Sequence, residues 1–172
     1  MSSAPKESCG VVGIRSSRED VASRIYWSLL TLNHRGHESY GIAVLKPGGR
    51  ILVERGLGLV SDLDIEKLSD WRRALKGQVG IGHVRYATSG QLSSKVDLLA
   101  DAQPTVGEHL GRSLCIAFNG NITNLLQVLR EFMGKAALQG GKSDIHVLLH
   151  LLVREYAESD LIDAPKLVCE KL

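Results

Sequence analysis

The chain has 172 residues, of which 44% are hydrophobic, enough for one compact domain with a core. Its 21 lysines and arginines nearly balance its 19 aspartates and glutamates, for a net charge of +2, and no block of like charge stands out. This balance indicates neither nucleic acid nor an acidic membrane as a partner. The longest apolar run, residues 145–153, is interrupted by two histidines and is far shorter than the roughly 20 residues of a membrane helix.

The N-terminus and the cysteines predict a cytoplasmic protein. Residues 1–8 are polar and lack the apolar segment of a secretory signal. The three cysteines, Cys9, Cys115 and Cys169, form no CxxC pair and leave an odd one over. This pattern argues against a disulfide framework and against a cysteine zinc site.

The first half of the chain predicts strands and one helix. Residues 9–14, CGVVGI, are short and β-branched and predict a buried strand. Residues 19–32 predict an amphipathic helix with Ser17 as its N-cap. We expect the sheet to bury its apolar face, which consists of Val21, Ile25, Leu29 and Leu32. Residues 41–45 and 50–55 resemble strands, and the KPGG between them is a turn signal, so we expect a hairpin.

The second half predicts more helix around a long loop over residues 87–112, which is rich in Ser, Asp, Gly and Pro and long enough to carry function. The hairpin and the short connections do not form a regular βαβ series, which favours α+β or layered α/β over a Rossmann sheet. The other expected elements are helices at 62–75, with Leu63, Leu68, Trp71 and Leu75 as core contacts, at 122–133 and at 144–159, and strands at 78–86 and 113–118.

Cys9 has two interpretations. A lone cysteine is commonly a small buried hydrophobe. A cysteine behind a short removable leader can instead become the first residue of the mature chain, where its own α-amino group acts as the base for its thiol. An α-amino group has a reference pKa of about 7.7 to 8.0, so it can accept a proton near neutral pH. The surrounding motifs favour the nucleophile.

Two further motifs suit the binding of an amide substrate. Arg85 ends an otherwise apolar strand; it is either a surface cation or a carboxylate ligand, which its planar guanidinium can bind through two hydrogen bonds. In FNGN, residues 118–121, Asn-Gly is a common turn signal. The same turn can direct the Asn119 side chain and the Gly120 backbone N–H to one point, as an oxyanion hole requires.

The last helix carries three polar candidates. Asp144 is either a first-turn residue favoured by the helix dipole or a binding residue. His146 and His150 have the i, i+4 spacing of a metal pair, but no HExxH pattern or third ligand accompanies them. We expect a half-buried helix face and no metal. Cys115 alternates within a strand and is expected in the core, and Cys169 carries no signal.

As a set, these motifs resemble the N-terminal glutaminase domain of the amidophosphoribosyltransferases, which are class II glutamine amidotransferases with an N-terminal nucleophile. The related sugar-phosphate aminotransferases usually carry a YRGYDSAG-like second motif, so HRGHES favours the purine enzyme. His37 and Tyr40 replace the Gln and Ala that are usual there. The matching motifs appear in the family's order over residues 9 to about 160: CGVVGI, LNHRGHESYGI, GHVRYATSG, the AQP at 102–104, FNGNITN and the Ser-Asp at 143–144.

The resemblance implies a role for each matching position. It makes Cys9 the nucleophile and Asn119 with Gly120 the oxyanion hole. Substrate contacts implied in the same way are Arg85 for the α-carboxylate of glutamine, Asp144 for its α-ammonium, Thr88 near the arginine, and Arg35 and Gly36 in the loop that closes beside the nucleophile.

The resemblance also implies the fold and the domain organisation. The family's fold is a four-layer αββα sandwich of the N-terminal nucleophile hydrolase type. Residues 1–8 correspond to a propeptide removed by self-cleavage between Ser8 and Cys9, and residues 9–172 to the glutaminase domain. The family's domain continues further and includes an RDPxGxRPL-like segment, so we expect this chain to be a truncated fragment or one half of a split enzyme, with a sandwich incomplete at its C-terminus.

The implied activity is hydrolysis of the glutamine side-chain amide to glutamate and ammonia. In the family, the ammonia converts phosphoribosyl pyrophosphate to phosphoribosylamine in de novo purine synthesis, a glycosyltransferase reaction on a phosphoribosyltransferase domain or subunit not found in these residues. We expect no cofactor in this chain, Mg²⁺ only in that transferase domain, and a homo-oligomeric full enzyme. The alternatives are a non-catalytic glutamine-binding regulatory or assembly subunit, a related hydrolase of another amide, or the glutaminase half of another class II amidotransferase such as a sugar-phosphate aminotransferase.

Overall fold

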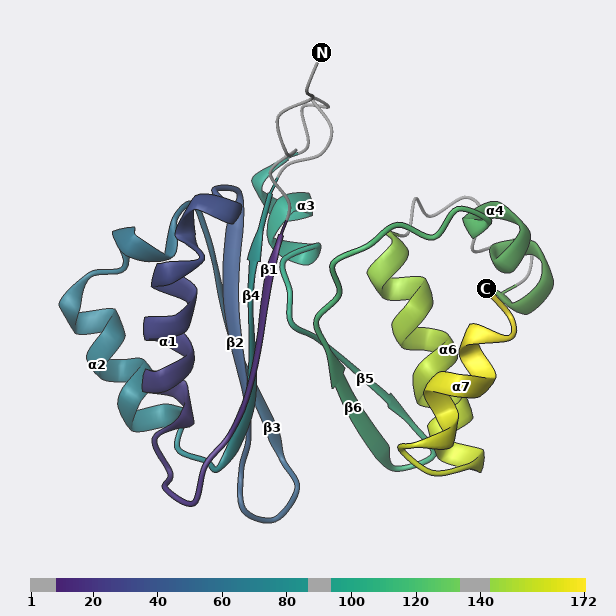
Figure 1. Cartoon of the computed structure of the whole chain (residues 1–172), viewed down its shortest axis with the longest axis horizontal. Coiled ribbons are helices and arrows are strands. Elements are labelled where there is room, and N and C mark those ends of the chain that lie inside the picture. Colours follow the sequence, from purple (N-terminus) through teal and green to yellow (C-terminus); the bar gives the residue numbers. More distant parts are fainter. Residues whose placement is uncertain (1–8, 87–93, 134–142) are drawn as a thin grey trace. The chain divides into compact units, whose positions relative to one another are not determined.

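The computed structural model describes residues 9–86, 94–133 and 143–172, which form two compact units. The first unit comprises the described residues up to 104 together with 117–119, and the second comprises 105–116 and the described residues from 120 onward. Each unit has an antiparallel sheet with helix packed against it, as Figure 1 shows. The expected α+β class is confirmed.

The sheet of the first unit has four antiparallel strands in the order β1-β4-β2-β3. Each lies where the sequence predicts a strand, and the KPGG hairpin joins β2 to β3 as expected. The pairing of β1 with β4 joins segments about 70 residues apart, which local patterns do not predict. The strands are β1 (Gly10–Arg15), β2 (Ser39–Leu45), β3 (Ile51–Leu57) and β4 (Val79–Arg85).

The helix α1 (Val21–Thr31) covers one face of this sheet. Its inner side chains Ile25 and Leu29 are fully buried. They reach the backbone of β4 because that strand has glycines beneath them: a Cβ at Gly80 would lie 2.8 Å from Ile25 Cδ1, and one at Gly82 would overlap Ile25 Cγ2. The periodicity of residues 19–32 therefore predicted the correct buried face.

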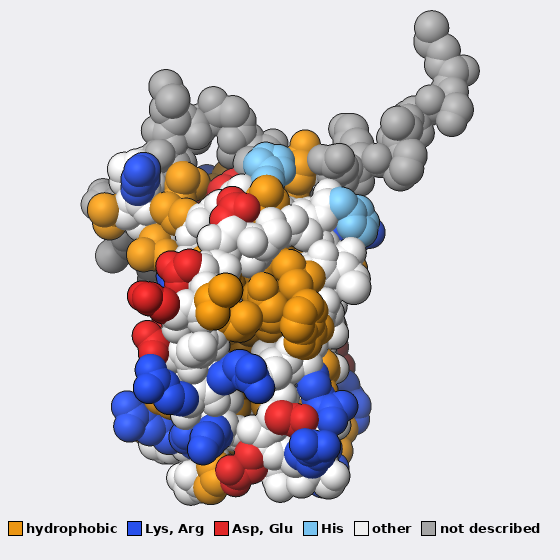
Figure 2. Space-filling model, turned by 90° about the vertical axis from the view of Figure 1, so that its left-hand side faces the viewer, with side chains coloured by type: hydrophobic (Ala, Val, Ile, Leu, Met, Phe, Trp, Pro, Cys, Tyr) orange, Lys and Arg blue, Asp and Glu red, His pale blue; other side chains and the backbone are white. Residues whose placement is uncertain are grey.

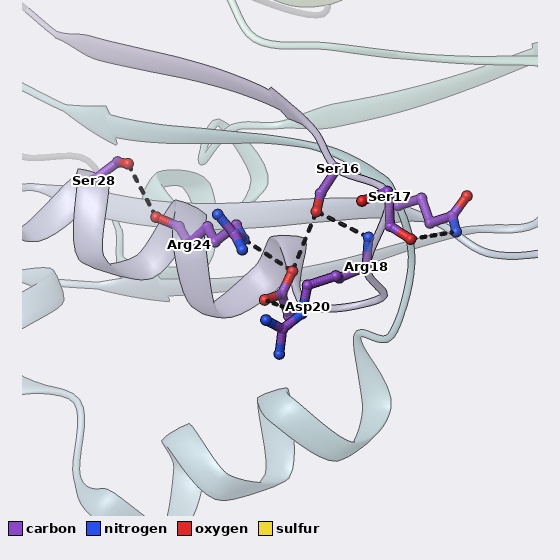
Figure 3. Close-up of polar contacts among 7 residues, drawn as sticks. Ser16, Ser17, Arg18, Asp20, Arg24 and Ser28 are labelled. Atoms are coloured by element: carbon purple, nitrogen blue, oxygen red, sulfur yellow. Dashed lines mark hydrogen bonds and ion pairs between the residues drawn. The ribbon is translucent and has the colours of Figure 1, made fainter.

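The expected N-cap of α1 is wrong, because Asp20 and not Ser17 precedes the helix. Figure 3 shows the contacts at this end. The Asp20 carboxylate accepts hydrogen bonds from Arg24 Nε at 2.9 Å and from Ser16 Oγ at 3.4 Å. Ser17 instead uses its backbone carbonyl to accept a hydrogen bond from Gln78 Nε2 at 3.1 Å, so it joins the turn after β1 to the residue before β4.

The helix expected over 62–75 is shorter than predicted. A 3-10 turn, Val60–Asp62, comes first, and α2 (Ile65–Ala74) starts after Asp64, whose carboxylate accepts a hydrogen bond from the Lys67 backbone N–H at 2.6 Å. This capping bond sets where the helix begins. Of the four expected core contacts, Trp71 and Leu75 are buried, while Leu63 and Leu68 are partly buried against the same core.

The outer surface formed by α1 and α2 is not uniformly polar. Trp27 is 64% exposed and Ile65 is 83% exposed. Figure 2 shows hydrophobic side chains gathered in the middle of this face, with basic side chains below them. Exposed apolar side chains are ordinary on protein surfaces, and we assign no function to this group.

The long loop expected over 87–112 is only partly correct, and its residues 87–93 lie outside the described part. Residues 94–109 contain a helix, α3 (Lys95–Ala100), and a strand, β5 (Thr105–His109). A capping box starts α3, because Ser94 Oγ accepts from the Asp97 N–H while the Asp97 carboxylate accepts from the Ser94 N–H. The polar composition of this segment therefore did not indicate its short helix or its short strand.

In the second unit, β5 pairs with β6 (Arg112–Ile116), and α6 (Asp144–Glu158) packs on this hairpin. Arg112 fastens the start of β6 to the end of α6, because its Nη1 donates to the carbonyl oxygens of Tyr156 and Ser159 at 2.6 and 2.8 Å. The expected strand and long helix are correct within two residues. Cys115 is half-buried and does not lie in the deep core.

The remaining helices of the second unit are short. The helix expected over 122–133 is shorter and irregular: α4 (Leu125–Val128) passes into a π-helical turn, Leu129–Met133. The helix α7 (Asp163–Cys169) was not predicted. Both pack on α6 through a small core whose buried members are Val128, Leu129, Val147, Leu151 and Val168. Across the described ranges, we find no helix long and apolar enough to cross a membrane.

His83 is a buried histidine of the first sheet, and its protonation affects stability. His83 of β4 is fully buried and has its pKa lowered to about 4; burial is the main cause, Arg85 contributes in the same direction, and the Phe118 backbone opposes the shift. Its ordinary pKa is 6.5. Between pH 6.5 and pH 4, the imidazole of His83 is therefore protonated in the unfolded chain but not in the folded chain. The contribution of neutral His83 to the free energy of unfolding is complete above pH 6.5 and is lost as the pH falls through 4.

We expect the wild-type free energy of unfolding to fall by about 3 kcal/mol more than that of a His83→Leu variant between pH 7 and pH 4. Urea denaturation of both proteins at several pH values measures this difference. The His83→Leu variant retains all the carboxylates, so their contribution to the pH dependence cancels when the two profiles are compared. Parallel pH profiles would show that His83 titrates normally in the folded protein.

Candidate functional site

Three strand ends of the first unit meet at the same edge of the four-stranded sheet. Gly10 of β1 pairs with Val84 of β4, and Ser39 of β2 pairs with Arg85 of β4. Cys9, which precedes β1, therefore lies beside the end of β4. The antiparallel order β1-β4-β2 thus brings the start of β1, the end of β4 and the start of β2 into one place.

The Cys9 residue is half-buried and is contacted by three other segments. The backbone N–H of Tyr86 points to its Sγ, at 3.5 Å. Its carbonyl oxygen accepts hydrogen bonds from Arg35 Nε at 3.3 Å and from Asn119 Nδ2 at 3.1 Å. The structure therefore brings Cys9, Arg35 and Asn119 together, although Asn119 is 110 residues away along the chain.

The turn between α1 and β2 fits closely against β4. It consists of a 3-10 turn, Asn33–Arg35, followed by Gly36, which is buried. A Cβ at Gly36 would lie 2.7 Å from the backbone N of Arg85 and 2.8 Å from its carbonyl oxygen. Glu38 continues the strand pairing, since its N–H donates to the Arg85 carbonyl at 3.0 Å and its carbonyl accepts from the Gly58 N–H at 2.9 Å. Only glycine leaves room for this approach.

Arg85 is paired within the protein. One of its terminal nitrogens forms an ion pair with the Glu38 carboxylate, and the other lies 3.9 Å from Asp101 Oδ2. The Glu38 side chain is 11% exposed and that of Arg85 is 23% exposed, so the pair is largely shielded from water. Sequence reasoning missed Glu38. The signal was available, because Glu38 is the acidic residue of HRGHES, directly before a strand.

The two unusual residues of the second motif occupy different surroundings. The ring of His37 packs edge-on against Tyr86, with centroids 4.8 Å apart, so it lies over the residue whose N–H faces the thiol. Tyr40 is buried and packs 5.9 Å from Trp71 in the core. Burial, and then the charges of Asp62 and Asp64, raise the pKa of Tyr40. Tyr40 is therefore a core residue, and only His37 borders the site.

The remaining expected site residues are not among the described residues of the first unit. Gly120 and Asp144 belong to the second unit. There the Asp144 carboxylate accepts a hydrogen bond from the Ile122 N–H at 2.7 Å, which ties the segment after FNGN to the first turn of α6. Thr88 lies outside the described residues. So does the expected propeptide, residues 1–8, which ends at the Ser8–Cys9 peptide bond.

The two histidines of α6 lie on a half-buried face, as expected. His146 Nδ1 is 2.8 Å from Ser143 Oγ, a hydrogen bond at the start of the helix. Within residues 9–86, 94–133 and 143–172, no group of three or more His, Cys, Asp or Glu side chains is arranged to hold a metal ion.

No protein-family model matches the chain. Curated relatives, in contrast, include several amidophosphoribosyltransferases. An amidophosphoribosyltransferase of Methanothermobacter thermautotrophicus is 42% identical over 171 residues, which is 97% of this chain and 34% of that protein. One from Methanocaldococcus jannaschii is 37% identical over 95% of this chain, and a chloroplastic one from Arabidopsis thaliana is 36% identical over 98% of it.

The chain is a homologue of the amidophosphoribosyltransferases, in their N-terminal part. It spans about a third of the length of these relatives. A solved glutamine phosphoribosylpyrophosphate amidotransferase from B. subtilis, complexed with ADP and GMP, matches 84% of this chain and 29% of its own, with a TM-score of 0.63 and 31% identity. A second structure, described as the allosteric regulatory enzyme of purine biosynthesis, matches with a TM-score of 0.64 and 32% identity. These likenesses confirm the expected N-terminal nucleophile type of fold.

The close fit at Gly36 gives a stability prediction. We expect Gly36→Ala to destabilise the protein by about 1 to 3 kcal/mol, because the added methyl group displaces backbone and not a flexible side chain. Gly13→Ala in β1 is the matched control, since its Cβ would meet nothing closer than Ile81 Cγ2 at 4.0 Å and should change stability by less than about 0.5 kcal/mol. Urea denaturation compares the two. Equal effects would show that the turn can move away from Arg85 without cost.

Proposed function

We propose that this chain is the glutaminase part of an amidophosphoribosyltransferase, with Cys9 as its nucleophile. The observation that supports the proposal most directly is the convergence of Arg35, Asn119 and the Tyr86 N–H on Cys9 in a homologue of these enzymes. Core packing alone does not require polar groups from three separate segments around one cysteine.

The first step is maturation. Cleavage of the Ser8–Cys9 peptide bond by water releases residues 1–8 and gives Cys9 a free α-amino group. That amine then takes the proton of the Cys9 thiol, and the Tyr86 N–H stabilises the resulting thiolate through the contact at 3.5 Å.

Recognition of glutamine is assigned to charged groups that match an amino acid. The Arg85 guanidinium has five N–H donors, so it can bind the α-carboxylate while Glu38 holds one of its nitrogens. Asp144 is assigned to the α-ammonium. This pairing of one cation and one anion would reject amides that lack the α-amino acid group.

The chemical step is attack of the thiolate on the side-chain amide carbon. Asn119 stabilises the tetrahedral oxyanion: its amide nitrogen carries two hydrogens, of which the bond to the Cys9 carbonyl uses one. The Gly120 N–H is assigned as the second donor, and each such donor contributes roughly 3 kcal/mol. Ammonia leaves with a proton returned by the α-amino group, and water hydrolyses the γ-glutamyl thioester to glutamate and free thiol.

The acceptor of the ammonia is assigned from the relatives. Their name, amidophosphoribosyltransferase, describes transfer to a phosphoribosyl group, and the B. subtilis structure names phosphoribosyl pyrophosphate. We therefore assign the product as phosphoribosylamine, formed on a phosphoribosyltransferase domain or subunit that acts together with this chain in purine synthesis.

We expect Cys9→Ala to abolish ammonia release from glutamine, and 6-diazo-5-oxo-norleucine to label Cys9 alone. Cys169→Ala is the control, because Cys169 is the exposed cysteine of α7 and should leave both activity and labelling unchanged. An ammonia assay and peptide mass spectrometry measure these results. Label on another residue would overturn the assignment of Cys9, and glutamine binding without ammonia release would indicate a non-catalytic subunit.

The intact mass of the purified chain tests maturation separately. A loss equal to residues 1–8 is expected for active protein. A full-length chain that nevertheless hydrolyses glutamine would show that the base is another group and not the α-amine of Cys9.

We expect Arg85→Lys to raise the KM for glutamine by about tenfold or more while kcat changes less, because lysine loses the planar pair of donors that binds a carboxylate. Steady-state glutaminase kinetics measure both constants. Arg72→Lys on the exposed face of α2 is the matched control and should leave KM unchanged. An unchanged KM for Arg85→Lys would remove this arginine from substrate recognition.

A further inference from the structure

The segment of residues 102–104 lies against the first sheet at β2 and β3. Arg55 of β3 donates from Nη1 to the Ala102 carbonyl oxygen at 2.8 Å. At Gly41 of β2, a Cβ would overlap the carbonyl oxygen of Gln103. Ala102 is fully buried and Gln103 is 6% exposed. The carbonyl groups of Ala102 and Gln103 therefore both lie against the sheet, at β3 and at β2 respectively.

The Gln103 side chain connects this segment to the oxyanion asparagine. Its Oε1 accepts a hydrogen bond from the Phe118 backbone N–H at 2.6 Å. Phe118 immediately precedes Asn119, whose side-chain amide donates to the Cys9 carbonyl oxygen at 3.1 Å. The contacts thus run from the sheet through Gln103 to Phe118, and from Asn119 to Cys9.

A buried polar residue of the sheet, His83, also lies close to the backbone of Phe118. His83 is paired with Gly41 in the β2–β4 register, so it stands next to the strand position that Gln103 crosses. It is fully buried and lies close to the Phe118 backbone. The backbone at Phe118 is therefore hydrogen-bonded to Gln103 and lies close to the buried His83, whereas Asn119 itself is exposed.

We propose that Gln103 is a positioning residue, which fixes the backbone N–H of Phe118 so that the side-chain amide of the next residue, Asn119, is held at Cys9. Gln103 touches neither the nucleophile nor the substrate in this scheme. Its effect on catalysis rests on the proposed glutaminase function, whereas its effect on the position of Asn119 does not.

Two variants separate the hydrogen bond from the volume of the side chain. Gln103→Met keeps a long, flexible side chain but lacks the oxygen acceptor. Gln103→Glu keeps an acceptor oxygen at the same distance from the backbone. The matched control is Gln127→Met on α4, where the glutamine is exposed.

Hydrogen exchange of the full 172-residue chain tests the positioning without any substrate. We expect a peptide that contains Phe118 and Asn119 to exchange about tenfold faster in Gln103→Met, and peptides from β2 and β4 to remain as protected as in the wild type. Gln103→Glu should restore most of the protection, and Gln127→Met should change nothing near residue 118. Unchanged exchange at Phe118, or equal loss of protection across β2 and β4, would overturn the proposal.

Glutaminase kinetics test the catalytic consequence through a double-mutant cycle. We expect Gln103→Met to lower kcat by about tenfold to a hundredfold with little change in KM, because a displaced oxyanion donor affects the transition state more than the bound substrate. In an Asn119→Ala background, Gln103→Met should cause almost no further loss. An equal loss in both backgrounds would show that Gln103 acts independently of Asn119. A wild-type protein without glutaminase activity would contradict the proposed function, and the exchange result would still decide the positioning.

Discussion

The arrangement of the first unit depends on the direct contact of α1 with the backbone of β4. Ile25 and Leu29 occupy the space above Gly80 and Gly82, where even a methyl group would collide. The strand β4 is central in the sheet, with β1 on one side and β2 on the other. The second unit repeats the arrangement, since a Cβ at Gly107 of β5 would lie 2.9 Å from Leu149 Cγ of α6.

The position of Cys9, the proposed nucleophile, follows from that central strand. Cys9 stands at the start of β1, Arg85 ends β4, and Glu38 lies just before β2, so their shared register places them at one edge of the sheet. Without Glu38, the largely shielded charge of Arg85 would keep, among the described residues, only its longer contact to Asp101, at 3.9 Å, which is unfavourable. The ion pair therefore holds the guanidinium in place, and under the proposed function this preorganisation lowers the entropic cost of binding glutamine.

Local sequence signals predicted those elements whose cause is local. The KPGG turn indicated the β2–β3 hairpin, and the apolar spacing over residues 19–32 indicated α1 and its buried face. The strand β5 was missed because its sequence, TVGEH, becomes a strand through its pairing with β6. The helix α3 was missed because it has only 6 residues and leaves Val96 and Leu99 exposed, so it lacks an apolar face to recognise.

For the site, the sequence by itself determined which chemical groups are available: a thiol near the N-terminus, arginines in two motifs and an amide in FNGN. Each of these is a property of a residue type within a short motif. Only the tertiary structure decided that Arg35 and Asn119 share the Cys9 carbonyl, that Arg85 is paired with Glu38, and that Gln103 holds the Phe118 N–H. These contacts join segments from 15 to 110 residues apart, and they depend on strand order and register, which arise from packing of the whole unit and not from any local pattern.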